Sequence, residues 1–239
     1  MLAMHGDEHH ALMASGIFSK TDPDVVTALM TQTPSVCFPA GRIVFAQGEP
    51  GDCLYVIVSG KAKVSYLHTD GREFVLNIVG ALDVFGELTP FDCGVREATV
   101  TALTDVRAVA IDRDQLLEWV ADCPEAIHQI MRLLARRAEM MTSSLADFAV
   151  CDPPQRVARR ILLLAKRFGM RDGDEVRVVH DMTSEEMSRY AGVAPELMDA
   201  ELCVLRDRGL IRCEDSCLVI VDGQGLASFA AKTEWRQQH

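Results

Sequence analysis

The spacing of glycines between Ser35 and Asp112 constrains the fold of this chain more than any other feature. Glycines there separate short apolar runs such as residues 54–58, Leu-Tyr-Val-Ile-Val. Each glycine marks a turn between two strands. Eight segments of this kind in about eighty residues predict a double-sheet jelly roll. A short helical lead-in is expected over 17–33, with Ser19 or Thr21 as its cap before Pro23. Because helical patterns precede and follow the strand-rich part, the sequence predicts an α+β chain.

A long helix is expected from about Pro124 to Val150. Apolar residues recur there in alternating steps of four and three, at positions 127, 131, 134, 138, 141, 145 and 148. This heptad spacing is typical of a helix that pairs with another along a narrow seam. It predicts a homodimer in which the partner is the same helix of a second copy. Packing against the chain's own jelly roll alone is the alternative.

The segment Asp152-Pro153-Pro154 predicts a hinge, because proline ends one helix and begins another. An amphipathic helix is expected over 156–168 and a strand over 176–179. These elements open a second domain.

The C-terminal part has the pattern of a winged helix-turn-helix. Thr183 and Glu186 form a capping box, Gly192 lies at the turn, and 195–207 is the second helix. Residues 209–211 lead into the wing strands. This arrangement predicts that the second helix enters the major groove of DNA.

Residues 83–101 bring together the groups that hold a sugar phosphate. Gly86 allows close backbone approach, the carboxylate of Glu87 accepts from a ribose hydroxyl, and Arg96 supplies a guanidinium for a phosphate. With the apolar residue Leu88 between them, the spacing is similar to the phosphate-binding cassette of cyclic-nucleotide-binding domains.

Over residues 17–225 the chain resembles the cyclic-AMP receptor and fumarate-nitrate regulator (CRP/FNR) family, and most closely its actinobacterial members. The resemblance implies a nucleotide-binding jelly roll at 17–122, a dimerisation helix and hinge at 123–151, and a winged helix-turn-helix domain at 152–239. It implies nucleotide contacts by Gly86, Glu87, Leu88, Arg96, Glu97, Met141 and Thr142. It implies DNA contacts by Thr183, Ser184, Pro195, Glu196, Asp199, Ala200 and Arg206.

The cassette departs from the family at Glu97, where relatives usually carry Ser or Thr. A carboxylate about 5 Å from a phosphate costs about 3 kcal/mol at an effective dielectric near 20. Either Glu97 points away, or Arg96 neutralises it, or the ligand is not the usual one. Met141 replaces a Thr that bonds the purine amino group, and this also weakens the case for cyclic AMP.

The reading helix departs from the family as well. Its usual Ser-Arg-Glu-Thr-Val start is replaced by residues 194–198, Ala-Pro-Glu-Leu-Met, so only Glu196 remains of the base-reading set. Each lost bidentate arginine removes about 1 to 3 kcal/mol of base discrimination. From residue 152 onward, 13 Lys and Arg face 15 Asp and Glu, and the whole chain has a net charge of -11. The basic excess of a strong DNA binder is therefore missing.

Two functions fit these observations. The first is a homodimeric DNA-binding transcription regulator with cyclic AMP as candidate effector, and with double-stranded DNA and RNA polymerase as partners. The alternative is a ligand- or redox-responsive binding protein of the same fold with reduced DNA recognition. No catalytic or metal-binding spacing was found, so neither an enzyme nor a required cofactor is expected. The eight cysteines contain no C-x-x-C pair, and without a long apolar run a cytoplasmic protein is predicted.

Overall fold

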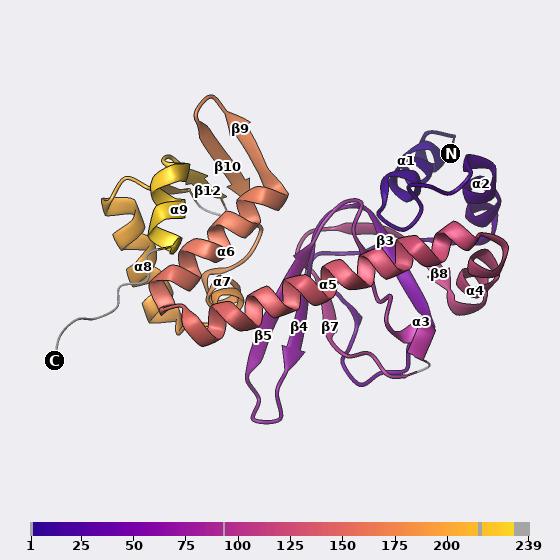
Figure 1. Cartoon of the computed structure of the whole chain (residues 1–239), viewed down its shortest axis with the longest axis horizontal. Helices are drawn as coiled ribbons and strands as arrows, with labels where there is room; N and C mark the ends of the chain where they lie inside the picture. Colours follow the sequence, from indigo (N-terminus) through magenta and orange to yellow (C-terminus); the bar gives the residue numbers. More distant parts are fainter. Residues whose placement is uncertain (1, 93, 215–216, 232–239) are drawn as a thin grey trace. The chain divides into compact units, whose positions relative to one another are not determined.

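The computed structural model describes residues 2–92, 94–214 and 217–231 (Figure 1). They form two compact units, one reaching to Met140 and one beginning at Met141. The boundary between the two units lies inside the long helix that contains Met140 and Met141. The three domain ranges taken from the sequence remain predictions.

The first unit contains the predicted jelly roll. Two antiparallel four-stranded sheets face each other, with the strand orders β1-β8-β3-β6 and β2-β7-β4-β5. The strands are β1 (Ser35–Phe38), β2 (Ile43–Phe45), β3 (Cys53–Ser59), β4 (Ala62–Leu67), β5 (Glu73–Val79), β6 (Val84–Phe85), β7 (Thr99–Ala102) and β8 (Val106–Asp112). The short helix α3 (Thr89–Asp92) lies between β6 and β7. The α+β class and the eight strands expected from the glycine spacing are thus confirmed.

Two helices precede the jelly roll. The sequence predicted one lead-in over 17–33, whereas the structure has α1 (Leu2–Ala14) and α2 (Pro23–Gln32). Asp22 caps α2 by accepting from the amide of Asp24, so the expected cap at Ser19 or Thr21 was wrong. Pro23 occupies the first helical position, where a missing N–H costs nothing.

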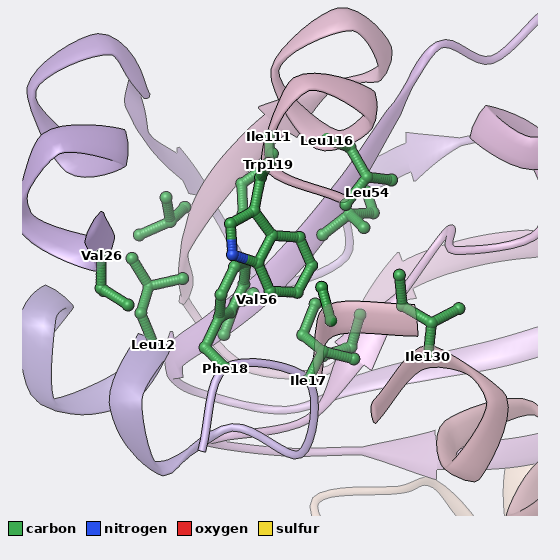
Figure 2. Close-up of a cluster of buried hydrophobic side chains, with 13 residues drawn as sticks. Leu12, Ile17, Phe18, Val26, Leu54, Val56, Ile111, Leu116, Trp119 and Ile130 are labelled. Carbon is green, nitrogen blue, oxygen red and sulfur yellow. The ribbon is translucent and has the colours of Figure 1, made fainter. Parts of the chain in front are cut away.

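An apolar cluster joins these helices to one face of the sheet that contains β3 (Figure 2). Leu12 and Phe18 are fully buried, and the Phe18 ring lies 4.5 Å from that of Trp119 on α4 (Arg113–Asp122). Ile130, from the next helix, closes the cluster. Burial of Leu12 and Phe18 removes two large side chains from water, which stabilises the unit by about 1.5 to 3 kcal/mol for each.

The long helix α5 runs over Pro124–Val150, as predicted. Ala126 and Ile130 face the core of the first unit, and Leu134 of the predicted seam packs partly against it, whereas the other seam residues are exposed. The exposed fractions are 62% for Met131, 70% for Met141 and 70% for Leu145. An apolar stripe of this kind remains open to water in the single chain.

The second unit contains the predicted helix pair and wing. Its sheet has the strand order β11-β12-β10-β9. The elements are α6 (Pro153–Phe168), β9 (Gly169–Asp172), β10 (Glu175–Val179), α7 (Ser184–Ala191), α8 (Pro195–Asp207), β11 (Ile211–Glu214), β12 (Cys217–Ile220) and α9 (Gly223–Ala231). Helix α6 begins three residues before the predicted 156, because two prolines fit its first turn.

Candidate functional sites

Arg96 is a buried cation that pairs with no carboxylate of the described residues. It lies three residues before the start of β7 and is 3% exposed. The guanidinium donates from Nη1 to the Gly86 carbonyl at 3.1 Å and from Nη2 to the Cys53 carbonyl at 2.8 Å. Nη1 also contacts the Thr89 hydroxyl at 3.3 Å. Buried charges are normally neutralised, so a cation held only by neutral acceptors favours an anion at this place.

The surroundings of Arg96 are shaped to hold this side chain. The guanidinium carbon lies 4.1 Å from the centre of the Phe45 ring, within the range of a cation–π contact. Nε is buried and has no hydrogen-bond partner. A Cβ built on Gly51 would lie 2.1 Å from this Nε, so only glycine fits beside it. Among the described residues, Nε is therefore the one donor of Arg96 that lacks a partner.

An aromatic group forms the wall behind Arg96. Tyr55 and Phe85 stack with their ring centres 5.0 Å apart, and Phe45 stacks on Tyr55 at 6.1 Å. Burial raises the pKa of Tyr55 well above its ordinary value, so the phenol stays neutral. This wall excludes water and lowers the local dielectric, which strengthens the attraction between Arg96 and an anion.

Glu87 lies next to Gly86 along the chain and is 7% exposed. Its carboxylate pairs with Nε of Arg137 on α5 at 3.2 Å. Nη2 of Arg137 donates to the Val84 carbonyl at 2.5 Å, so this arginine joins α5 to the residues on both sides of Gly86. Glu87 is thus held in place and keeps lone pairs for a hydroxyl group.

Arg137 was missing from the residues chosen by sequence. A lone arginine on a helix surface looks like a solvated charge. Its signal was its position four residues before Met141, because residues at this spacing share a helix face. The predicted base-contacting residues therefore pointed to it.

The other residues predicted to contact the nucleotide are exposed, unlike Arg96 and Glu87. Leu88 is 48% exposed at the edge of the cassette, and Glu97 is also exposed. Within the described part of the chain, Glu97 is not among the partners of Arg96. Met141 and Thr142 are exposed on α5, and their assignment to the base remains a prediction.

The helix-turn-helix of the second unit has the predicted local structure. Thr183 caps α7 by accepting from the amide of Glu186, and Glu186 completes the capping box. Gly192 ends α7 in the left-handed region, with φ at 65°. Met198 and Leu205 attach α8 to the core of the unit. The second helix begins at Pro195 and ends at Asp207, as the sequence predicted.

The predicted DNA contacts lie at two places on this unit. Thr183 and Ser184 are exposed at the start of α7. On α8, Glu196, Asp199 and Ala200 share one exposed face at one-turn spacing. Pro195 is exposed at the start of the same helix, and Arg206 is exposed about 15 Å further along it. The face nearest the turn is therefore acidic.

Other basic groups of this unit already have partners. Arg189 pairs with Glu185 at 2.6 Å, and Arg212 pairs with Glu175 at 2.9 Å. His180 is buried and its Nδ1 accepts from the amide of Met182, so the imidazole is used inside the domain rather than for a phosphate contact.

Comparison with known proteins covers both units. A model of the cyclic nucleotide-binding domain matches residues 35–123, and a model of the Crp-like helix-turn-helix domain matches residues 155–229. The CRP-like cAMP-activated global transcriptional regulator of Mycobacterium tuberculosis (strain H37Rv) is 45% identical over 219 residues. The match covers 92% of this chain and 98% of that protein. The chain belongs to the CRP/FNR family.

More distant members of the CRP/FNR family agree. The Cyclic AMP receptor protein of Thermus thermophilus is 28% identical over 201 residues, which cover 84% of this chain and 90% of that protein. The structure of FixK2 from Bradyrhizobium japonicum matches with a TM-score of 0.75 at 17% identity, over 84% of this chain and 98% of that one. This last likeness shows the fold.

The chain is accordingly a CRP-like transcription regulator with a cyclic-nucleotide-binding domain and a helix-turn-helix DNA-binding domain. The alternative of a binding protein with reduced DNA recognition is not favoured, because the matches include the DNA-binding domain. Its relatives are transcription regulators rather than enzymes. No helix in the described ranges is long and apolar enough to cross a membrane.

Proposed function

We propose that this regulator binds a cyclic nucleotide, with cyclic AMP as the first candidate, and acts on DNA as a homodimer. The observation that supports the effector is Arg96, a buried guanidinium that no carboxylate of the described residues neutralises. A phosphate there supplies the missing negative charge. Two relatives, which are 45% and 28% identical to this chain, have cyclic AMP in their names, and this supports the same choice.

Glu87 supplies the second contact. A carboxylate accepts hydrogen bonds from the ribose hydroxyl of a nucleotide. In the structure Glu87 is fixed by Arg137 of α5. A ribose that bonds Glu87 therefore also acts on the residue that ties the cassette to the long helix. We propose that effector binding is passed to α5 by this pair.

The proposed dimer rests on the exposed apolar stripe of α5. Met131, Met141 and Leu145 are each at least 62% exposed in the single chain. Side chains of this kind are normally covered, and their heptad spacing suits a second copy of the helix. RNA polymerase is the further partner expected of a transcription regulator.

Calorimetric titration with cyclic AMP, with cyclic GMP as comparison, tests the effector. Arg96→Ala should reduce the affinity at least tenfold, because it removes the guanidinium that would pair with the phosphate. Arg72→Ala is the matched control, since Arg72 is exposed on the β4–β5 turn and pairs with Asp70. Equal affinities of Arg96→Ala and the wild-type protein would contradict the assignment.

The variant Glu97→Ser tests whether the carboxylate at this position weakens binding of the nucleotide. Glu97 is exposed, and serine at this position removes the repulsion of the phosphate and adds a hydrogen-bond donor. The variant should therefore bind cyclic AMP more tightly. If the wild-type protein binds neither nucleotide while the folded dimer is intact, the proposed effector is wrong.

A further inference from the structure

We infer that the last turns of α5 are a fixed part of the DNA-binding domain, and that Phe148 positions the helix-turn-helix through the turn at Gly192. The contacts that carry this inference all lie within the second unit, between residues 144 and 192. It does not depend on the effector, because it concerns how the reading domain is held.

Phe148 reaches the turn of the helix-turn-helix directly. A Cβ built on Gly192 would lie 2.2 Å from Cε1 of the Phe148 ring, so the ring takes the space of a side chain at that position. Gly192 adopts a left-handed φ and ends α7. Any movement of the ring therefore meets the backbone that sets the direction from α7 to α8.

Arg156 of α6 joins the same two places. It donates from Nη1 to the Cys151 carbonyl at 2.9 Å and from Nη2 to the Gly192 carbonyl at 3.2 Å. Its guanidinium carbon lies 5.6 Å from the centre of the Phe148 ring. The end of α5 and the turn thus share one arginine as well as one aromatic ring.

Arg160 adds a buried layer behind this contact. It is 5% exposed and lies 5.6 Å from the Phe148 ring and 4.9 Å from the ring of Tyr190 on α7. Its Nη1 donates to the Ser144 hydroxyl at 3.2 Å. Burial of Arg160 between two rings fixes α5, α6 and α7 against one another.

A third arginine holds the same face of α5, since Asp147 lies three residues after Ser144 and next to Phe148. Arg159 pairs with Asp147 at 2.6 Å, and Asp147 is 7% exposed. Removing one partner of a partly buried ion pair costs more stability than removing one partner of a surface pair. Ser144, Asp147 and Phe148 are therefore all attached to α6.

These contacts change the meaning of Asp152-Pro153-Pro154. The sequence predicted a hinge there, but Asp152 and Gln155 form a capping box and both prolines lie in the first turn of α6. With α5 clamped on one side and α6 on the other, we assign this segment as a fixed elbow. A change in the direction of the end of α5 then moves α8 with it.

Phe148→Ala tests the positioning role, with Leu145→Ala as the matched control. Both residues belong to the same apolar stripe of α5, but Leu145 is 70% exposed and takes no part in the contacts above. Any effect of weakened dimerisation is therefore shared by both variants. Phe148→Tyr keeps the ring and should restore the wild-type behaviour.

The first readout is hydrogen–deuterium exchange of the purified full-length protein without nucleotide. Phe148→Ala should speed exchange of residues 191–194 at least about tenfold while leaving β10 and β12 protected. The second readout is binding to a DNA duplex enriched from a random pool by the wild-type protein. Its affinity should fall at least about tenfold in Phe148→Ala, and much less in Leu145→Ala.

The inference fails if Phe148→Ala matches Leu145→Ala in exchange at the turn and in DNA affinity. If Phe148→Ala instead unfolds the domain, exchange rises across β9–β12 as well, and Arg160→Lys becomes the test. That variant keeps the positive charge but replaces the planar guanidinium that lies over both rings, and so weakens its contact with them. Faster exchange limited to the turn is therefore expected. Unchanged exchange in Arg160→Lys would then overturn the inference.

Discussion

Arg96 shows how a single buried charge defines a site. The Arg96 guanidinium contacts two carbonyls, a hydroxyl and an aromatic ring, and no carboxylate of the described residues balances its charge. The two glycines beside it, Gly51 and Gly86, allow the close approach that larger residues would prevent. The free energy needed to bury this cation comes from the fold of the jelly roll and is recovered when an anion binds.

Leu82 carries backbone strain at the residue scale. Its φ is 71°, in the left-handed region that costs an ordinary side chain about 1 to 2 kcal/mol. Leu82→Asn should raise the free energy of unfolding by about 0.5 to 1 kcal/mol, because asparagine tolerates this region and the leucine is 37% exposed. Urea unfolding measures this change.

Leu76→Asn is the control for that substitution. Leu76 is 48% exposed on the extended strand β5, where asparagine is disfavoured. The same exchange should therefore lower the stability there. A loss of stability at both positions would show that the backbone at Leu82 is not strained.

At the scale of elements, local signals predicted most of the helices. The bounds of α5 and α8 followed from the heptad spacing of α5 and from the proline at the start of each helix, and the capping box marked the start of α7. Helix α1 was not predicted, because Leu12 gains its burial from distant residues of the jelly roll. The clamp on Phe148 was also missed, since Arg156 and Arg160 acquire their partners only when α5, α6 and α7 fold together.

The sheet of the second unit should lose stability in acid. Hydrogen bonds from Arg212 lower the pKa of Glu175 and Glu214 below their ordinary value of 4.5. A carboxylate with a lowered pKa stabilises the fold above 4.5, and this contribution is lost as the pH falls through the lowered pKa. Both carboxylates are exposed to solvent, so the effect should be small.

Arg212→Met isolates this contribution. Hydrogen–deuterium exchange of β10 and β11 compares the variant with the wild-type protein at matched pH between neutral and about 3. The variant should exchange faster at neutral pH, and the difference should shrink as the pH falls. A difference that stays constant over this range would rule out the two carboxylates as its cause.

For the whole molecule, the exposed stripe on α5 predicts assembly. Met131→Glu places a charge on the seam and should weaken dimerisation at least about tenfold. Ser143→Glu adds the same charge at an exposed position of the same helix, two residues from Met141 and from Leu145 and so away from the seam, and should leave the dimer intact. Sedimentation equilibrium of the two variants distinguishes them, and equal association would contradict the proposed interface.

At the scale of the whole molecule, the two domains and their order could be predicted from the sequence, because both follow from short-range sequence patterns. What it missed is contact between distant residues. Arg137 meets Glu87 fifty positions away, and no periodicity within α5 alone reveals that partner. The site is therefore visible in outline from its motif, while the residues that join it to α5 require the fold.

The most direct test of this account measures DNA binding with and without saturating cyclic AMP, for the wild-type protein and for Arg96→Ala. The probe is a fluorescent duplex enriched by the wild-type protein from a random pool in the presence of cyclic AMP. The account predicts that the nucleotide changes the DNA affinity of the wild-type protein at least about fivefold and leaves that of Arg96→Ala unchanged. Equal affinities with and without nucleotide in the wild-type protein would contradict it.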